Sequence, residues 1–115
     1  MSAKRPDRAA PPGPGEWDVR FGTTEAAKGW EVLCQQAAGA TLDAWKLMRA
    51  SPRRRGQAGT SSCGGDLAEK VIDGRSCEQW QIEVTSGGRI WYAIDDARHV
   101  VWIMYASAAH PKATG

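Results

Sequence analysis

The chain has 115 residues and a formal net charge of +2, which allows one domain with a real core and does not by itself indicate nucleic-acid binding. Its three cysteines are unevenly spaced and include no Cys-x-x-Cys pair, so we expect no disulfide framework, no metal site and no cofactor. No apolar run approaches the ~20 residues of a membrane span and the start lacks the apolar segment of a signal peptide, so we expect a reduced, cytoplasmic protein without membrane contact.

The first residues combine many prolines with few side chains that could be buried. Residues 1–15 contain four of the six prolines, and we predict a disordered tail there, followed by one folded domain over residues 16–115. Residues 16–21, Glu-Trp-Asp-Val-Arg-Phe, alternate strictly between polar and apolar side chains. This alternation predicts a short strand that joins the later sheet.

Two stripes of apolar residues at helical spacing follow this strand. Thr23 or Thr24 can cap the first helix and Thr41 the second, while Gly39 interrupts the pattern between them. The stripes consist of Ala26, Trp30, Leu33 and Ala37, and then Leu42, Trp45 and Met48 or Arg49. We therefore predict a helical hairpin that ends before Pro52 and covers one face of the sheet.

The remaining chain predicts a loop and then successive strands. Residues 53–65 are polar, rich in glycine and without period, which predicts a loop, and residues 66–72 can form a further strand. Three apolar runs within residues 79–107 are separated by turn signals at 85–88 and 95–98, which predicts a meander. The predicted fold is thus an α+β domain with a short strand, a helical hairpin and an antiparallel four-stranded meander.

Side chains alternate along a strand, so the two faces of the meander can be assigned. The apolar face carries Trp80, Ile82 and Val84 from one strand, and Ile90, Tyr92 and Ile94 from the next. The opposite face carries Gln79, Gln81, Glu83, Arg89 and Trp91. We expect the helices to cover the apolar face and the mixed face to stay open to a ligand.

The order of these elements and three short motifs resemble the RelE/ParE toxin superfamily. The motifs are Trp-Gln-Ile-Glu-Val at 80–84, Arg-Ile-Trp-Tyr-Ala-Ile-Asp at 89–95 after a Gly-Gly turn, and His-Pro-Lys at 110–112. The resemblance covers roughly residues 16–113, looks closest to the RelE-like toxins of the cytotoxic translational repressor type, and is strongest in the second motif. It implies a toxin of a type II toxin–antitoxin system: a metal-independent, ribosome-dependent mRNA endoribonuclease that inhibits translation. It also implies a cognate antitoxin of the helix-turn-helix, DNA-binding type as partner, beside mRNA and the ribosome.

The resemblance also implies roles for single residues. Arg89 matches the family's arginine that contacts the scissile phosphate, and His110 falls on or near its C-terminal proton-transferring histidine. Attack by a 2′-hydroxyl needs a base, an acid and a cation for the charged transition state, and histidine and arginine suit these roles. Glu83 lies on the same predicted face as Arg89, so it is a candidate second proton acceptor.

Other residues are candidates for binding the RNA. The basic residues Arg53, Arg54, Arg55 and Lys112 can neutralise phosphates, and Trp91 can stack on a base. The chain also departs from the family pattern. Basic residues expected before the second strand of the meander are replaced by the segment at 61–65, Ser-Ser-Cys-Gly-Gly, and an arginine expected after the 80–84 motif is Thr85.

Several alternatives stay open at this point. Arg89 can instead be a surface arginine paired with Glu83 across the hairpin, and His110 an ordinary residue of the chain end. At the level of function, the alternatives are a ParE-like toxin that poisons DNA gyrase by contact, and a catalytically degenerate relative that only binds its antitoxin.

Overall fold

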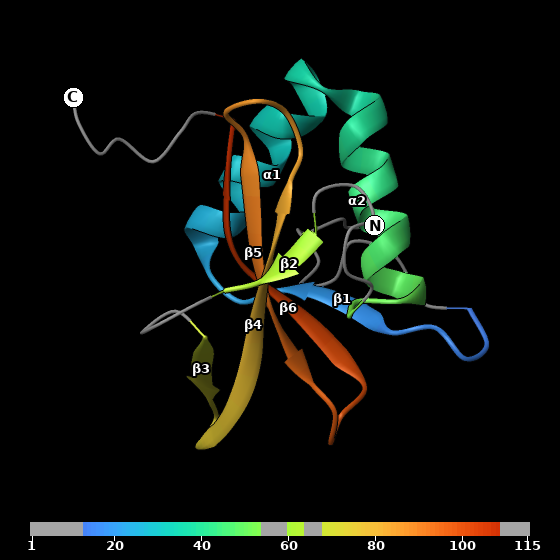
Figure 1. Cartoon of the computed structure of the whole chain (residues 1–115), viewed down its shortest axis with the longest axis vertical. Helices are drawn as coiled ribbons and strands as arrows, with labels where there is room; N and C mark the ends of the chain where they lie inside the picture. Colours follow the sequence, from blue (N-terminus) through green and yellow to red (C-terminus); the bar gives the residue numbers. More distant parts are fainter. Residues whose placement is uncertain (1–12, 54–59, 64–67, 109–115) are drawn as a thin grey trace, which may run out of the picture.

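The computed structural model describes residues 13–53, 60–63 and 68–108, and Figure 1 shows their arrangement. The elements are β1 (Asp18–Phe21), α1 (Thr24–Gln36), α2 (Ala38–Ala50), β2 (Thr60–Ser62), β3 (Glu69–Ile72), β4 (Arg75–Glu83), β5 (Arg89–Asp95) and β6 (Val100–Ser107). The predicted fold class is confirmed: an α+β domain with an N-terminal strand, two helices and then antiparallel strands. Residues 1–12 of the predicted tail lie outside the described residues.

All six strands belong to one mixed sheet with the order β1-β6-β5-β4-β2, and β3 pairs with β4. The strands β3, β4, β5 and β6 form the predicted antiparallel meander. β1 joins this sheet as predicted, and it runs parallel to β6, with Val19 opposite Val101. Among the described residues, no helix is long and apolar enough to cross a membrane.

The prediction of a loop over residues 53–65 was wrong in part. Thr60–Ser62 form β2, which pairs with Trp80–Ile82 of β4, while β3 pairs with the preceding part of β4. The sequence Thr-Ser-Ser carries no apolar alternation, so no local pattern predicts this strand, which forms by pairing with the edge of β4. Residues 54–59 and 64–67 lie outside the described residues.

The first helix begins as predicted and the second does not. The Thr23 hydroxyl oxygen accepts a hydrogen bond from the Ala26 amide at 2.9 Å, which caps α1. The chain then turns at Ala37, whose amide donates to the Leu33 carbonyl at 2.7 Å, and α2 starts directly at Ala38. Gly39 therefore lies within the helix, where it causes no break.

Thr41 was predicted to cap α2, which is wrong. Its buried hydroxyl lies one turn inside the helix and donates to the carbonyls of Ala37 at 2.8 Å and Leu33 at 3.2 Å. The buried face of α2 is accordingly rotated from the predicted one, and Leu42 is 46% exposed. The residues of α2 that are buried are Thr41, Ala44, Leu47 and Met48.

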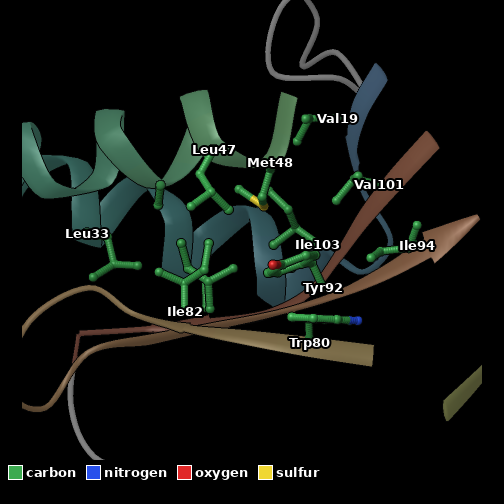
Figure 2. Close-up of a cluster of buried hydrophobic side chains, with 14 residues drawn as sticks. Val19, Leu33, Leu47, Met48, Trp80, Ile82, Tyr92, Ile94, Val101 and Ile103 are labelled. Atoms are coloured by element: carbon green, nitrogen blue, oxygen red, sulfur yellow. The ribbon is translucent and has the colours of Figure 1, made fainter. Parts of the chain in front are cut away.

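Both helices contribute to a core on one face of the sheet. Figure 2 shows Leu33, Leu47 and Met48 on the helix side and Ile82, Tyr92 and Ile103 on the sheet side of this core. Trp80, Ile82, Ile90, Tyr92 and Ile94 are all at most 4% exposed, so the predicted apolar face is the covered one.

Tyr92 ties the helical layer to the centre of the sheet. Its side chain is fully buried, and its hydroxyl donates a 2.6 Å hydrogen bond to the Pro52 carbonyl, just beyond the end of α2. Burial raises the pKa of the Tyr92 hydroxyl far above its ordinary value. The hydroxyl therefore stays protonated and keeps its role as donor.

At Gly29 the backbones of α1 and β6 come close together. A Cβ atom at Gly29 would lie 1.8 Å from the Ala106 carbonyl oxygen, whereas a Cβ at Gly39 in α2 would meet nothing within 4 Å. Because the obstacle at Gly29 is backbone, it cannot move aside as a flexible side chain does. Only glycine allows α1 to pack this closely on β6.

We expect Gly29→Ala to lower the free energy of unfolding by about 1–3 kcal/mol, because overpacking outweighs the gain in helix propensity. Gly39→Ala is the matched control and should raise the free energy of unfolding by about 0.5–1 kcal/mol. Urea denaturation followed by circular dichroism measures both. Equal effects of the two substitutions would contradict the close approach of α1 to β6.

We expect Tyr92→Phe to lower the free energy of unfolding by about 1–2 kcal/mol, because the Pro52 carbonyl loses its buried donor. Tyr105→Phe, a change at a partly exposed tyrosine of β6, should stay within about 0.5 kcal/mol of the native chain. Chemical denaturation compares them. A loss at Tyr92 no larger than that at Tyr105 would show that the hydrogen bond does not hold the two layers together.

Candidate functional site

The face of the sheet opposite the helices carries a set of polar and aromatic side chains. They come from three neighbouring strands and lie opposite one another in register: Glu83 faces Arg89, Gln81 faces Trp91, and Trp91 faces Tyr105. Glu83 is exposed and the other four residues are partly exposed, while their core-facing neighbours Ile82 and Ile90 are at most 1% exposed. We call Gln81, Glu83, Arg89, Trp91 and Tyr105 the open-face cluster.

Arg89 lies on this face, as its position in the strand predicts. Its Nη2 atom lies 3.6 Å from the Glu83 Oε2 atom, and the side chains of Arg89 and Glu83 are 20% and 49% exposed. The cross-strand ion pair of the alternative interpretation is therefore present. An exposed pair at this distance stabilises a fold only weakly, so Arg89 can exchange Glu83 for another anion at small cost.

Trp91 is held in place from two sides. Its indole nitrogen donates a 2.9 Å hydrogen bond to the Gln81 side-chain oxygen. Its ring lies 4.6 Å from the Tyr105 ring, measured between centroids, with 36° between the two planes. Trp91 therefore presents a ring in a defined orientation, two residues along β5 from Arg89.

Tyr105 is a member of the cluster that sequence reasoning missed. The pairing of β5 with β6 shifts between Trp91, which faces Tyr105, and Tyr92, which faces Ile103. Met104 is therefore an extra residue on β6, and this bulge reverses the alternation. In a regular strand with Ile103 in the core, Tyr105 would also point toward the core. No local sequence pattern predicts the bulge that prevents this.

The mixed face is buried at the C-terminal end of β5, where Asp95 is only 2% exposed. Its carboxylate accepts a 3.3 Å hydrogen bond from the Trp102 indole. It also lies 3.8 Å from the Arg75 guanidinium and 3.7 Å from that of Arg98. Gln79, on the same face of β4 as Gln81, is also buried and only 3% exposed.

Arg53 is not brought together with Arg89. Its guanidinium donates to Glu78 at 2.7 Å and to both carboxylate oxygens of Asp96 at 3.1 and 2.8 Å. Glu78 shares a strand face with Trp80, so this network lies on the helix side of the sheet. The hydrogen bonds from Arg53 lower the pKa values of Glu78 and Asp96. Because these two carboxylates already neutralise Arg53, it is a poor candidate for binding an RNA phosphate.

The remaining predicted site residues lie outside the described parts of the chain: Arg54, Arg55, His110 and Lys112. The histidine that the structure does describe, His99, stacks on Trp17 with ring centroids 3.9 Å apart and is not part of the open-face cluster. No group of three metal-ligating side chains occurs within residues 13–53, 60–63 and 68–108.

Comparisons of the chain with protein-family models, with curated proteins and with solved structures found no match. The expected resemblance to the RelE/ParE superfamily therefore rests only on the short sequence motifs at 80–84, 89–95 and 110–112 and on the order of the elements.

We expect Arg89→Gln to change the free energy of unfolding by less than about 1 kcal/mol, because its pair with Glu83 is half exposed. Asp95→Asn should cost about 2 kcal/mol, because it removes a charged acceptor from a buried set of partners. Thermal or urea denaturation separates the two. If Arg89→Gln were the more damaging change, Arg89 would be a structural residue and not a candidate for ligand binding.

Proposed function

We propose that the chain is the toxin of a type II toxin–antitoxin system, that it resembles the RelE-like toxins, and that it cleaves mRNA at the open-face cluster. The observation that carries this proposal is the position of Arg89. β5 holds its guanidinium on the face that the helices leave uncovered, beside the Glu83 carboxylate at 3.6 Å and two residues from Trp91. A cation, a proton acceptor and an aromatic ring thus share one accessible surface.

This combination suits cleavage of RNA by its own 2′-hydroxyl group. The 2′-oxygen attacks the adjacent phosphorus atom while the bond from phosphorus to the 5′-oxygen breaks. The Glu83 carboxylate accepts the 2′-hydroxyl proton, and an acid donates a proton to the departing 5′-oxygen. The Arg89 guanidinium donates hydrogen bonds to the phosphate oxygens, where negative charge grows in the transition state. The products are a 2′,3′-cyclic phosphate and a 5′-hydroxyl end.

The ion pair between Glu83 and Arg89 prepares both residues for these roles. In the absence of RNA, each neutralises the other across the β4–β5 hairpin. A phosphate that binds Arg89 replaces Glu83 as its partner, because it offers more acceptor oxygens to the guanidinium fork. The carboxylate released in this way is then available as the proton acceptor.

His110 is the proposed acid. Ser107 lies directly opposite Arg89 in the β5–β6 pairing, and His110 follows three residues later in the sequence. Three residues of chain span at most ~10 Å, so the chain length is compatible with an imidazole near Arg89. Lys112, Arg54 and Arg55 remain the candidates for holding the RNA backbone, whereas Arg53 is engaged elsewhere and is left out of the proposed site.

A second candidate function is that of a catalytically degenerate relative that only binds its antitoxin. Two observations favour it. Glu83 already balances the charge of Arg89, and the basic residues expected at 61–65 and at Thr85 are absent. Binding DNA gyrase, as ParE-like toxins do, draws no specific support from the described residues. In each case the proposed partner is a cognate antitoxin that covers the open face.

Expression of the native chain should arrest growth and translation, and Arg89→Ala should abolish both effects. In a cleavage assay with a short RNA, loss of this cation should slow the reaction about 100-fold or more, and Arg89→Lys should recover part of the rate. A 2′-deoxy substitution at the cleaved nucleotide should block the reaction, and chelators of divalent cations should not.

Arg53→Gln is the matched control, since Arg53 is also an arginine with carboxylate partners, Glu78 at 2.7 Å and Asp96 at 2.8 Å, and it lies outside the proposed site. This variant should remain toxic. Full toxicity of Arg89→Ala would contradict the enzymatic proposal. A harmless native chain would favour the antitoxin-binding relative, and DNA-damage signalling without translation arrest would favour the gyrase alternative.

A further inference from the structure

We propose that Trp91 and Tyr105 form one stacking surface that binds a purine base of single-stranded RNA, next to the phosphate held by Arg89. This inference rests on the proposed function and deepens it, because it names the part of the substrate that the protein recognises directly. It uses Tyr105, which only the β-bulge brings to this face.

The two rings act as a single surface because they already touch. Their centroids are 4.6 Å apart and their planes are inclined by 36°, a separation typical of aromatic rings in direct contact. A base therefore cannot enter between them and must stack on their outward faces. A purine covers more of this joined surface than a pyrimidine does, which gives the site its preference.

The hydrogen bonds of the cluster determine how a base can bind. The indole nitrogen of Trp91 is occupied by the Gln81 side chain at 2.9 Å, so Trp91 offers its ring face and no free donor. The same hydrogen bond fixes the ring orientation before any ligand arrives. Less conformational freedom is then lost on binding, and stacking is favoured over recognition through the indole edge.

The spacing and charge of the site suit a nucleotide. Arg89 and Trp91 are two residues apart on the same face of β5, about 7 Å along the strand, which is comparable to the separation of a base from a neighbouring phosphate. An apolar protein surface laid over the same residues would remove water from the Arg89–Glu83 pair, and the cost of desolvating both charges would not be repaid by new hydrogen bonds. A phosphate beside a stacked base instead gives Arg89 an anionic partner.

The test uses a non-cleavable 2′-O-methyl oligouridylate that contains one central 2-aminopurine, a base whose fluorescence falls when it stacks on an aromatic ring. The native chain should quench this fluorescence and should bind the oligonucleotide at least about threefold more tightly than an all-uridine control. Trp91→Thr and Tyr105→Thr should each weaken binding about 10-fold and remove the quenching. Tyr105→Thr leaves the Trp91–Gln81 hydrogen bond intact, so this variant still tests the proposal if Trp91→Thr unfolds.

Trp30→Phe is the control, because this partly exposed tryptophan packs against Phe21 on the helix side; it should bind like the native chain. If the native chain cleaves RNA but Trp91→Thr and Tyr105→Thr bind the oligonucleotide as tightly as it does, the stacking surface is wrong and the ribonuclease proposal stands. Base-dependent quenching without any RNA cleavage would support the stacking surface and contradict the ribonuclease. If the native chain binds neither oligonucleotide, the proposal of a base-stacking surface is wrong, and a protein is the better candidate for the partner of this face.

Discussion

The structure depends on the one-sided packing of the helical hairpin against β5 and its neighbours. Tyr92 anchors this packing through its hydrogen bond to Pro52, and Gly29 allows α1 to lie directly on the backbone of β6. Because both helices lie on the same side, the side chains that alternate with Ile90 and Tyr92 are left to the other face. Arg89 and Trp91 are accessible for this reason.

The two ends of the uncovered face have different electrostatic characters. At one end Asp95 is buried among Arg75, Arg98 and Trp102, so its charge is compensated within the fold. At the other end, the ion pair of Glu83 and Arg89 is long and half exposed. A charged side chain that contributes little to the stability of the fold can pair with a ligand instead. The end that carries Glu83 and Arg89 is therefore the better candidate for binding and cleaving RNA.

Arg53 shows why a run of basic residues is a poor guide to a binding surface. In the sequence it begins the run Arg-Arg-Arg and appears equivalent to Arg54 and Arg55. In the structure it bridges Glu78 and Asp96 on the helix side. Those partners lie 25 and 43 residues away in the chain, so only the fold brings them to Arg53.

The sequence by itself determined the fold class, the apolar face of the meander and the placement of Arg89 opposite it, because local alternation and turn signals carry that information. Tertiary structure alone decided three further features: the pairing of β2 with the edge of β4, the burial of Gln79 and the bulge that adds Tyr105 to the open face. Each of these depends on contacts between segments far apart in the chain, which no local pattern of residues encodes.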